Sequence, residues 1–284
     1  MNYVRWDERP RLQRPVLIAA FEGWNDAAEA ATTAARYLRD RWGARPFASV
    51  DPEEFYDFSS TRPEVRMDGM SRRIIWPANE LSSTKALPEG DGRDVVVLIG
   101  SEPQLKWRTF CAELVAVARE LNVELMVTLG ALLADVAHTR PVKITGSAVD
   151  AELVKKLGLR RSQYEGPTGI VGVLHDALAE ADVPTASLWA AVPHYVAATP
   201  SPKAALALVE RTSRLINVPV VTADLAQLAA DYERQVSEVV AADEDVSAYV
   251  ARLEENADSE GLELTSGEDL AAELQRFLRE QGES

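Results

Sequence analysis

The chain has 284 residues, of which 46% are hydrophobic, so it is long enough and apolar enough to fold around a full core. Its single cysteine, Cys111, excludes an internal disulfide framework and a cysteine-based zinc site. The formal net charge is −15, and most of it lies in residues 223–284, which contain 17 acidic residues and 4 arginines. This acidic surplus repels phosphate, so we expect no nucleic-acid partner and an attraction to basic protein surfaces.

No apolar run reaches the roughly 18 residues that a membrane-spanning helix needs, and the first residues carry no hydrophobic signal region. We therefore expect a cytoplasmic protein without a membrane partner. The sequence contains neither a P-loop nor a regular spacing of metal ligands. It predicts no cofactor and no metal site.

The stretch from Pro15 to Tyr37 is predicted to form a strand, a turn and a helix. Its apolar run Pro15–Phe21 lacks polar alternation, which is typical of a strand buried on both faces of a parallel sheet. Asp26 is expected to cap the following helix, with Glu29 reaching back. Ligands and partners tend to bind at the carboxyl edge of such a sheet. The turn residues predicted at that edge are Glu22, Gly23, Trp24 and Asn25.

Shorter elements follow this unit. The sequence predicts a strand at Pro46–Asp51, a loop or edge hairpin over residues 52–70, and an edge strand at Arg72–Trp76. Acidic side chains are scattered through this region without a ligand spacing, so we interpret them as a solvated loop.

The run Asp94–Gly100 predicts a second buried strand, and a helix is expected to open at Ser101–Pro103. That helix carries a core stripe with Cys111 on its flank, as a packed and unreactive thiol. Glu102 follows this strand at the same edge as Glu22. Its carboxylate either lines a pocket there or stabilises the start of the helix through the helix dipole.

A further strand is predicted at Val123–Leu129 and is expected to end at Gly130. His138 and Arg140 come next, and this pair either binds an anion or forms a loop held by hydrogen bonds to the backbone. Ser147 and Asp150 form a capping pattern for a helix that ends near Gly158.

The glycine-rich segment Glu165–Gly172 lacks both a preceding buried strand and the spacing of a nucleotide fingerprint. We predict a tight turn containing Gly169, in which Thr168 caps the next helix. The strand Thr185–Val192 leads to His194 and Tyr195. No nucleophile-elbow serine accompanies His194, so a catalytic triad is not expected.

From Thr222 onward the apolar residues recur only at helical spacing, which predicts three amphipathic helices. The third would carry Leu270, Leu274, Phe277 and Leu278. We therefore predict two domains: a three-layer α/β/α core over residues 1–221 with a mostly parallel central sheet, and an acidic, all-helical appendage over residues 222–284.

Several short motifs stand in a characteristic order and spacing. They are Phe21–Ala27, Gly100–Pro103 with Trp107 and Phe110, Leu129–Gly130, His138–Pro141, Gly169–Gly172, and Val192–Tyr195 with Pro200–Leu206. Together they resemble the proteasome assembly chaperone 2 family over residues 15–216, and the acidic helical tail is similar to that of the longer bacterial members. The resemblance implies the three-layer fold, self-association and a role in proteasome assembly, and the family has also been related to ATP-grasp carboligases.

Three hypotheses follow for the function. The leading one is a non-enzymatic binding protein that forms a homo-oligomer and recognises proteasome subunits or another assembly. The second is an ATP-dependent ligase or another small-molecule enzyme that uses a strand-edge pocket. The third is a structural homo-oligomer with no other partner. The candidate pocket or interaction residues are Glu22, Gly23, Trp24, Asn25, Asp26, Glu102, Arg140, Gly169, His194 and Tyr195.

Overall fold

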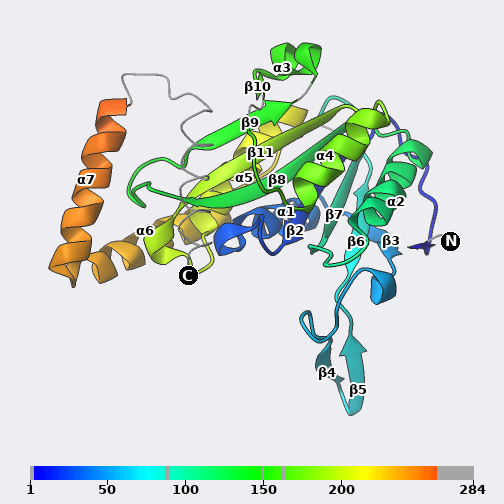
Figure 1. The fold of residues 1–284 in the computed structure, drawn as a ribbon, viewed down its shortest axis with the longest axis horizontal. Coiled ribbons are helices and arrows are strands. Elements are labelled where there is room, and N and C mark those ends of the chain that lie inside the picture. Colours follow the sequence, from blue (N-terminus) through cyan, green and yellow to red (C-terminus); the bar gives the residue numbers. More distant parts are fainter. Residues whose placement is uncertain (1–2, 87–89, 149, 162–163, 261–284) are drawn as a thin grey trace.

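The computed structural model describes residues 3–86, 90–148, 150–161 and 164–260. Within these residues, nine strands form one sheet in the order β1-β3-β6-β7-β2-β8-β11-β9-β10. Figure 1 shows this sheet with helices on both sides. The strands are β1 (Val4–Trp6), β2 (Val16–Glu22), β3 (Arg45–Val50), β6 (Asn79–Thr84), β7 (Val95–Ser101), β8 (Leu125–Ala134), β9 (Ile144–Ala148), β10 (Arg160–Arg161) and β11 (Thr185–Pro193).

The centre of the sheet is parallel and its flanks are mixed. Strands β7, β2, β8 and β11 run parallel to one another, whereas β1, β3 and β6 join them through antiparallel pairs. On the other side β9 pairs antiparallel with β11, and β10 runs parallel to β9. The prediction of a mostly parallel central sheet is confirmed for the strands that carry the core.

Helices cover both faces of this sheet. Helices α1 (Ala30–Arg41) and α5 (Pro202–Ile216) pack on one face, and α2 (Trp107–Glu120) and α4 (Ile170–Glu180) on the other. Alternate residues of β2 enter the two cores: Val16, Ile18 and Ala20 face α1 and α5, and Leu17, Ala19 and Phe21 face α2 and α4. This is why the strand shows no polar alternation, and it confirms the three-layer fold.

Two helix starts differ from the predictions. Helix α2 begins at Trp107 rather than at Ser101, because the amides of Gln104 and Leu105 donate to the carbonyl of Phe55 at 2.9 and 3.0 Å. Asp26 does cap α1, by accepting hydrogen bonds from the amides of Ala31 and Thr32. Glu29, however, does not close a capping box.

Glu29 instead adopts a left-handed backbone with φ of +52° and donates its own amide to the Asp26 carbonyl at 3.0 Å. A short 3₁₀ turn at Ala27–Glu29 separates Asp26 from the helix, and Ala28 within it also has a left-handed φ, of +50°. The chain therefore enters α1 through a kinked turn that the capping pattern did not predict.

Strand β8 continues four residues beyond Gly130, the position where we predicted its end. A Cβ atom at Gly130 would lie 2.6 Å from the ring of Trp189, its partner on β11, so the glycine makes room for the indole. Ser147 lies within β9 rather than capping a helix, whereas Asp150 caps α3 (Ala151–Leu157) and Gly158 ends it as predicted.

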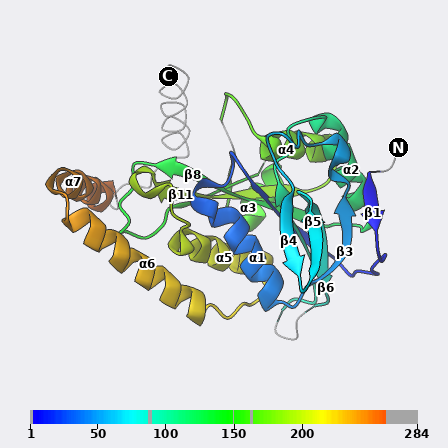
Figure 2. The same ribbon diagram turned by 90° about the horizontal axis from the view of Figure 1, so that it is seen from below.

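The acidic tail forms α6 (Ala223–Ala241) and α7 (Glu244–Glu260) within the described residues. Helix α6 packs against α5, and α7 lies across the C-terminal end of α6, as Figures 1 and 2 show, where it also contacts the loop after β8. The buried side chains of α6 are Leu225, Ala229, Tyr232, Val236 and Val240. The third predicted helix lies outside the described residues. In the part of the chain that the structure describes, no helix is long and apolar enough to cross a membrane.

A separate two-stranded ribbon projects from the body of the molecule (Figure 1). It consists of β4 (Glu64–Asp68) and β5 (Ser71–Ile75), and every residue of both strands is exposed. The edge strand predicted at Arg72–Trp76 corresponds to β5, which pairs with β4 and not with the main sheet.

Candidate functional site

The carboxyl ends of β2 and β7 bring the first group of predicted residues together. Glu22 and Ser101 lie opposite each other in the parallel pair, and the amide of Glu102 donates to the Glu22 carbonyl at 2.8 Å. The Glu22 carboxylate accepts a hydrogen bond from the Ser101 hydroxyl at 3.0 Å and forms an ion pair with Arg36 of α1. Glu22 therefore ties two strands and a helix together at this edge.

Glu102 is the centre of this group. Its Oε1 accepts hydrogen bonds from Asn25 Nδ2 at 3.0 Å and from the amide of Ile170 at 2.7 Å. Ile170 is the first residue of α4, where unpaired amides and the helix dipole favour a negative charge. Of the two interpretations of Glu102, the helix-stabilising one describes its contacts, although the helix is α4 and not the one that follows Glu102 in sequence.

Gly169 allows this contact. A Cβ atom at Gly169 would lie 2.4 Å from Asn25 Nδ2 and 2.7 Å from Glu102 Oε1, closer than real side chains approach. Gly169 is also the N-cap of α4, so the prediction that Thr168 caps this helix is wrong, and the distant Glu102 takes that role. The structure thus gathers Glu22, Gly23, Asn25, Glu102 and Gly169 at one edge, where Gly23 forms the turn beside Glu102.

Asp26 and Trp24 flank this group in opposite environments. Asp26 is buried beneath the start of α1, and burial raises the pKa of its carboxyl above the usual value despite the hydrogen bonds from Thr32 and Ala31. Trp24 is 46% exposed. Asp26 therefore supports the turn, whereas Trp24 leaves nearly half of its surface open to solvent.

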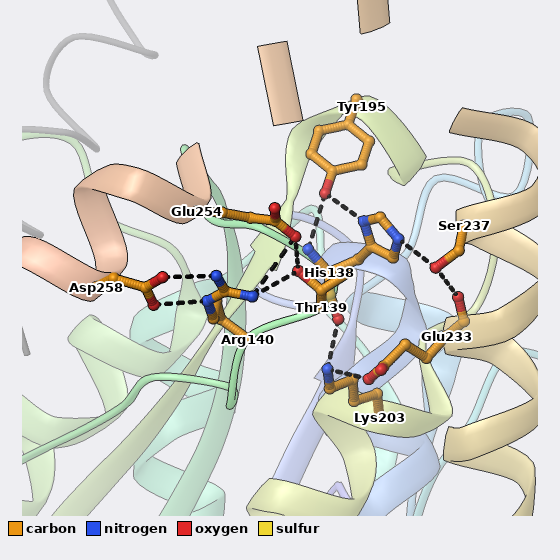
Figure 3. A network of polar contacts seen from close by, with 9 residues as sticks. All are labelled: His138, Thr139, Arg140, Tyr195, Lys203, Glu233, Ser237, Glu254 and Asp258. Carbon is orange, nitrogen blue, oxygen red and sulfur yellow. Dashed lines mark hydrogen bonds and ion pairs between the residues drawn. The ribbon is translucent and has the colours of Figure 1, made fainter. Parts of the chain in front are cut away.

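A second group of predicted residues lies beyond β8 and β11, where the core meets the tail (Figure 3). His138 is buried, with 3% of its surface exposed, and its amide donates to the Tyr195 hydroxyl at 2.8 Å. Its Nδ1 lies 2.8 Å from the same hydroxyl, and its Nε2 lies 3.0 Å from Oγ of Ser237 on α6. Ser237 donates its own proton to the Glu233 carbonyl. Nε2 is therefore the donor to Ser237, and in the neutral imidazole Nδ1 accepts a hydrogen bond from the Tyr195 hydroxyl.

The neutral state of His138 agrees with its surroundings. Burial, together with the nearby Lys203 ammonium, lowers the pKa of His138 below the usual value. Lys203 of α5 donates to the His138 carbonyl and to Glu233 of α6. Burial also raises the pKa of Tyr195 to about 12, so this hydroxyl stays protonated. The network holds α6 against the core.

Arg140 extends the network to α7. Its Nε and Nη2 each donate to one carboxylate oxygen of Asp258 at 2.7 Å, and the neighbouring Thr139 hydroxyl donates to Glu254. The bidentate geometry is the one that guanidinium groups prefer for carboxylates. Of the two interpretations of His138 and Arg140, anion binding describes Arg140, and the anion is a carboxylate of the chain's own tail.

His194 and Tyr195 complete the second group through aromatic contacts. The His194 ring packs edge-on against Tyr195 and Tyr249, with ring centroids 5.9 and 5.6 Å apart, and its Nδ1 lies 3.1 Å from Asp135. The Tyr249 hydroxyl of α7 donates to the same carboxylate at 2.8 Å. The ten predicted residues therefore fall into two groups, one that binds the turns and helices of the core and one that binds the tail.

Sequence reasoning missed Lys203 of the core and the tail residues of this network, which are Glu233, Ser237, Glu254 and Asp258. Glu254 and Asp258 stand four residues apart on α7 and so share one helix face, a spacing that predicts a common basic partner but does not identify it.

Cys111 is buried as predicted, and burial raises the pKa of its thiol to about 12. In the described ranges, no three His, Cys, Asp or Glu side chains are placed to hold a metal ion.

The fold and this edge define a class: three-layer α/β/α proteins in which the polar groups at the ends of the parallel strands fasten helices. A sequence model described as the PAC2 family matches residues 20–240. The chain belongs to the PAC2 family.

Solved structures agree with this membership. A PAC2 family protein from Streptomyces avermitilis is 48% identical, with 83% of this chain and 99% of that chain covered and a TM-score of 0.78. A proteasome-assembly chaperone homologue from Mycobacterium tuberculosis is 47% identical over 83% and 99% of the two chains, with a TM-score of 0.75. An archaeal proteasome activator from Pyrococcus furiosus, 16% identical over 83% and 97% with a TM-score of 0.66, shares the fold. A comparison with curated proteins gives no match.

Proposed function

We propose that the chain is a non-enzymatic protein-binding factor that assists the assembly of other subunits and acts as a homo-oligomer. The observation that carries this proposal is that both carboxylates at the strand edge, Glu22 and Glu102, are engaged by other groups of the chain. Glu22 is held by Arg36 and Ser101, and Glu102 by Asn25 and the first amide of α4. In enzymes of α/β architecture this edge presents reacting groups to a ligand. Here the same groups fasten helices.

The exposed residues at this edge fit recognition of a protein surface. Trp24 and Leu105 expose 46% and 47% of their surface. Aromatic side chains contribute a large share of the energy in protein interfaces, because they bury much apolar area with few rotatable bonds. We propose Trp24 as a contact residue for the partner, supported by the rigid turn beneath it.

The relatives suggest which partner to test first. The Mycobacterium tuberculosis relative is described as a proteasome-assembly chaperone homologue, and more distant structures as an archaeal proteasome activator and an archaeal homologue of proteasome-assembly chaperone. Similarity to these relatives establishes the fold of this chain more securely than its function. Proteasome subunits are therefore the proposed partners, and we expect the acidic tail to be attracted to any basic surface that they present.

Affinity purification of the tagged full-length protein from its native cell, followed by mass spectrometry, tests this proposal. We expect proteasome subunits to co-purify with the wild type and to be depleted with Trp24→Ala. Val221→Ala, which truncates a side chain that is 73% exposed elsewhere, serves as the control and should not change the capture. If no subunit is enriched over a mock purification, and their assembly is unchanged without the protein, the proposed partner is wrong.

An enzymatic role is tested on the same protein. Purified wild type, Glu102→Ala and His194→Ala are assayed for turnover of ATP with magnesium, esters and peptides. The proposal expects no turnover in any of them. Turnover by the wild type that is lost in either variant would overturn the non-enzymatic part of the proposal.

A further inference from the structure

The β4–β5 ribbon has two chemically different faces. Side chains alternate between the faces of a strand, so the paired residues Val65 and Ile74 share one face with the next pair, Met67 and Arg72. The remaining pairs occupy the other face, and they are polar or charged apart from Ile75: Glu64 with Ile75, Arg66 with Arg73, and Asp68 with Ser71. We call the first set the apolar ribbon face.

The apolar ribbon face lies open to solvent in the single chain. Val65, Met67 and Ile74 expose 50%, 66% and 45% of their surface, and Met70 at the tip is fully exposed. An isolated two-stranded hairpin is marginally stable in water, and exposed apolar patches mark interaction sites. The ribbon therefore has the character of one half of an interface.

Its charges indicate what the other half carries. Residues 62–76 contain four arginines and two carboxylates. Both carboxylates are paired on the polar face, Glu64 with Arg66 at 3.1 Å and Asp68 with Arg73 at 3.4 Å. Arg72, on the apolar ribbon face, has no ion-pair partner among the described residues. A matching surface would combine exposed apolar side chains with a carboxylate.

One exposed flank of α6, beside its buried stripe, has this combination. Leu228 and Val239 expose 56% and 71% of their surface, and eleven residues, or about three helical turns, place them on one line along the helix. Asp231 and Glu238 lie on the side of this line away from the buried stripe, where each is also paired with Arg234, at 2.9 and 3.9 Å. Residues 223–260 contain eleven carboxylates and two arginines, so the whole region attracts a basic ribbon.

We propose that the apolar ribbon face of one copy docks on the exposed flank of α6 that carries Leu228 and Val239 in a second copy. This deepens the self-association part of the proposed function and names its surfaces. A symmetric pairing of two ribbons would instead bring two surplus-arginine surfaces together, which like charges oppose. Because the ribbon and α6 lie in different parts of the molecule (Figures 1 and 2), each copy can use both at once in a head-to-tail contact.

Light scattering with size-exclusion chromatography of the full-length protein provides the first test. Ile74→Asp puts a charge on the apolar ribbon face and Leu228→Asp puts one on α6. Each should raise the concentration needed for association at least about tenfold. Ile75→Asp is the matched control, because Ile75 is the next residue, is 42% exposed and lies on the other face, and it should associate like the wild type.

Mixing the two variants separates a head-to-tail contact from a symmetric one. Ile74→Asp retains an intact α6 and Leu228→Asp retains an intact ribbon, so an equimolar mixture can form one good contact and should yield a heterodimer. Circular dichroism must show the wild-type fold in each variant, and any variant that fails this check is replaced by Met67→Asp or Val239→Asp.

An oligomeric wild type whose size none of these variants changes would overturn the ribbon proposal and leave self-association standing. Two variants that are monomeric both alone and mixed would overturn the head-to-tail arrangement. A wild type that stays monomeric at all concentrations would overturn both. Capture of proteasome subunits is measured separately, so its failure does not affect these results.

Discussion

The tail helix α6 and the β4–β5 ribbon both contain apolar and charged residues, but only α6 buries apolar side chains against the rest of the chain. Helix α6 buries Leu225, Tyr232 and Val236 against the chain itself and is fastened by the network around His138. The ribbon buries none of its ten strand residues. Apolar residues that the chain covers stabilise its fold, and those that it leaves open are available to a second molecule.

This contrast predicts that removing the tail harms the fold and that removing the ribbon does not. Truncation before Thr222 exposes the surface that α6 covers, and a loss of about 3–4 kcal/mol would lower Tm by roughly 10 °C in a chain of this size. The remaining core should still melt cooperatively, because residues 1–221 contain the whole main sheet. Replacing residues 64–75 by a short Gly-Ser turn should leave Tm within a few degrees of the wild type.

Calorimetry of both truncated proteins measures this difference. A tail truncation that no longer melts cooperatively would show that the tail completes the core, and the division into residues 1–221 and 222–284 would be wrong.

Acid provides a second comparison, because one histidine in the core and one at the tail attachment have lowered pKa values, whereas the ribbon contains no histidine. His175 of α4 is hydrogen-bonded to Thr128 at 2.8 Å, and burial lowers the pKa of its imidazole to about 4. The unfolded chain takes up this proton near pH 6.5, so stability is lost as the pH falls from about 6.5 to about 4, by up to about 3 kcal/mol.

Urea unfolding of wild type and His175→Gln at pH 7, 5.5 and 4.5 measures this loss. The glutamine keeps a hydrogen-bonding group and does not titrate, so the variant should lose less stability than the wild type over this range. Thr128→Val is the control, because it removes the partner, keeps the imidazole and should retain the pH dependence. Equal slopes for the wild type and His175→Gln would contradict the prediction.

His138 tests the attachment of the tail itself. His138→Leu removes the hydrogen bonds to Tyr195 and Ser237 and leaves both hydroxyls without this partner, at a cost of about 1–3 kcal/mol. His194→Leu is the matched control, because its side chain is 41% exposed, and it should cost at most about 0.5 kcal/mol. Thermal unfolding compares the stability of the two variants. An equal loss of stability would show that the buried hydrogen bonds of His138 do not stabilise the tail attachment more than the exposed His194 does.

The sequence predicted the parts of the fold that depend on local patterns. The unbroken apolar runs of β2, β7 and β11 located the central strands. Strand β9 was missed because its residues are mostly half-buried and include a glycine and a serine. The start of α2 was misplaced because distant hydrogen bonds to Phe55 decide it.

The candidate site shows the same division. Glu22 and Glu102 were expected at one edge, because parallel strands end on the same side of a sheet, and they lie there. Their hydrogen-bond partners, and those of Arg140, could not be predicted from the sequence. Ile170 is 68 positions from Glu102, and Asp258 is 118 positions from Arg140. Strand patterns predict where a polar residue lies, and only the tertiary structure shows what it binds.

The smallest effect is expected at Arg140, which joins the core to α7 through exposed groups. Its side chain and that of Asp258 are 33% and 63% exposed, and water and salt weaken exposed ion pairs. Arg140→Met should therefore leave Tm nearly unchanged. The ion pair lowers the pKa of Asp258, so its contribution is present at neutral pH and disappears as that carboxylate is protonated in acid.

The loss of this ion pair should appear in the local opening of α7, because α7 is the outermost described element of the tail. We expect proteolytic cleavage within α7 to be about threefold faster in the variant at low salt, and the difference to shrink at high salt. Arg234→Met, whose ion pairs stay within α6, should be cleaved there at the wild-type rate. Equal cleavage rates for all three proteins would show that the Arg140 ion pair does not hold α7 in place.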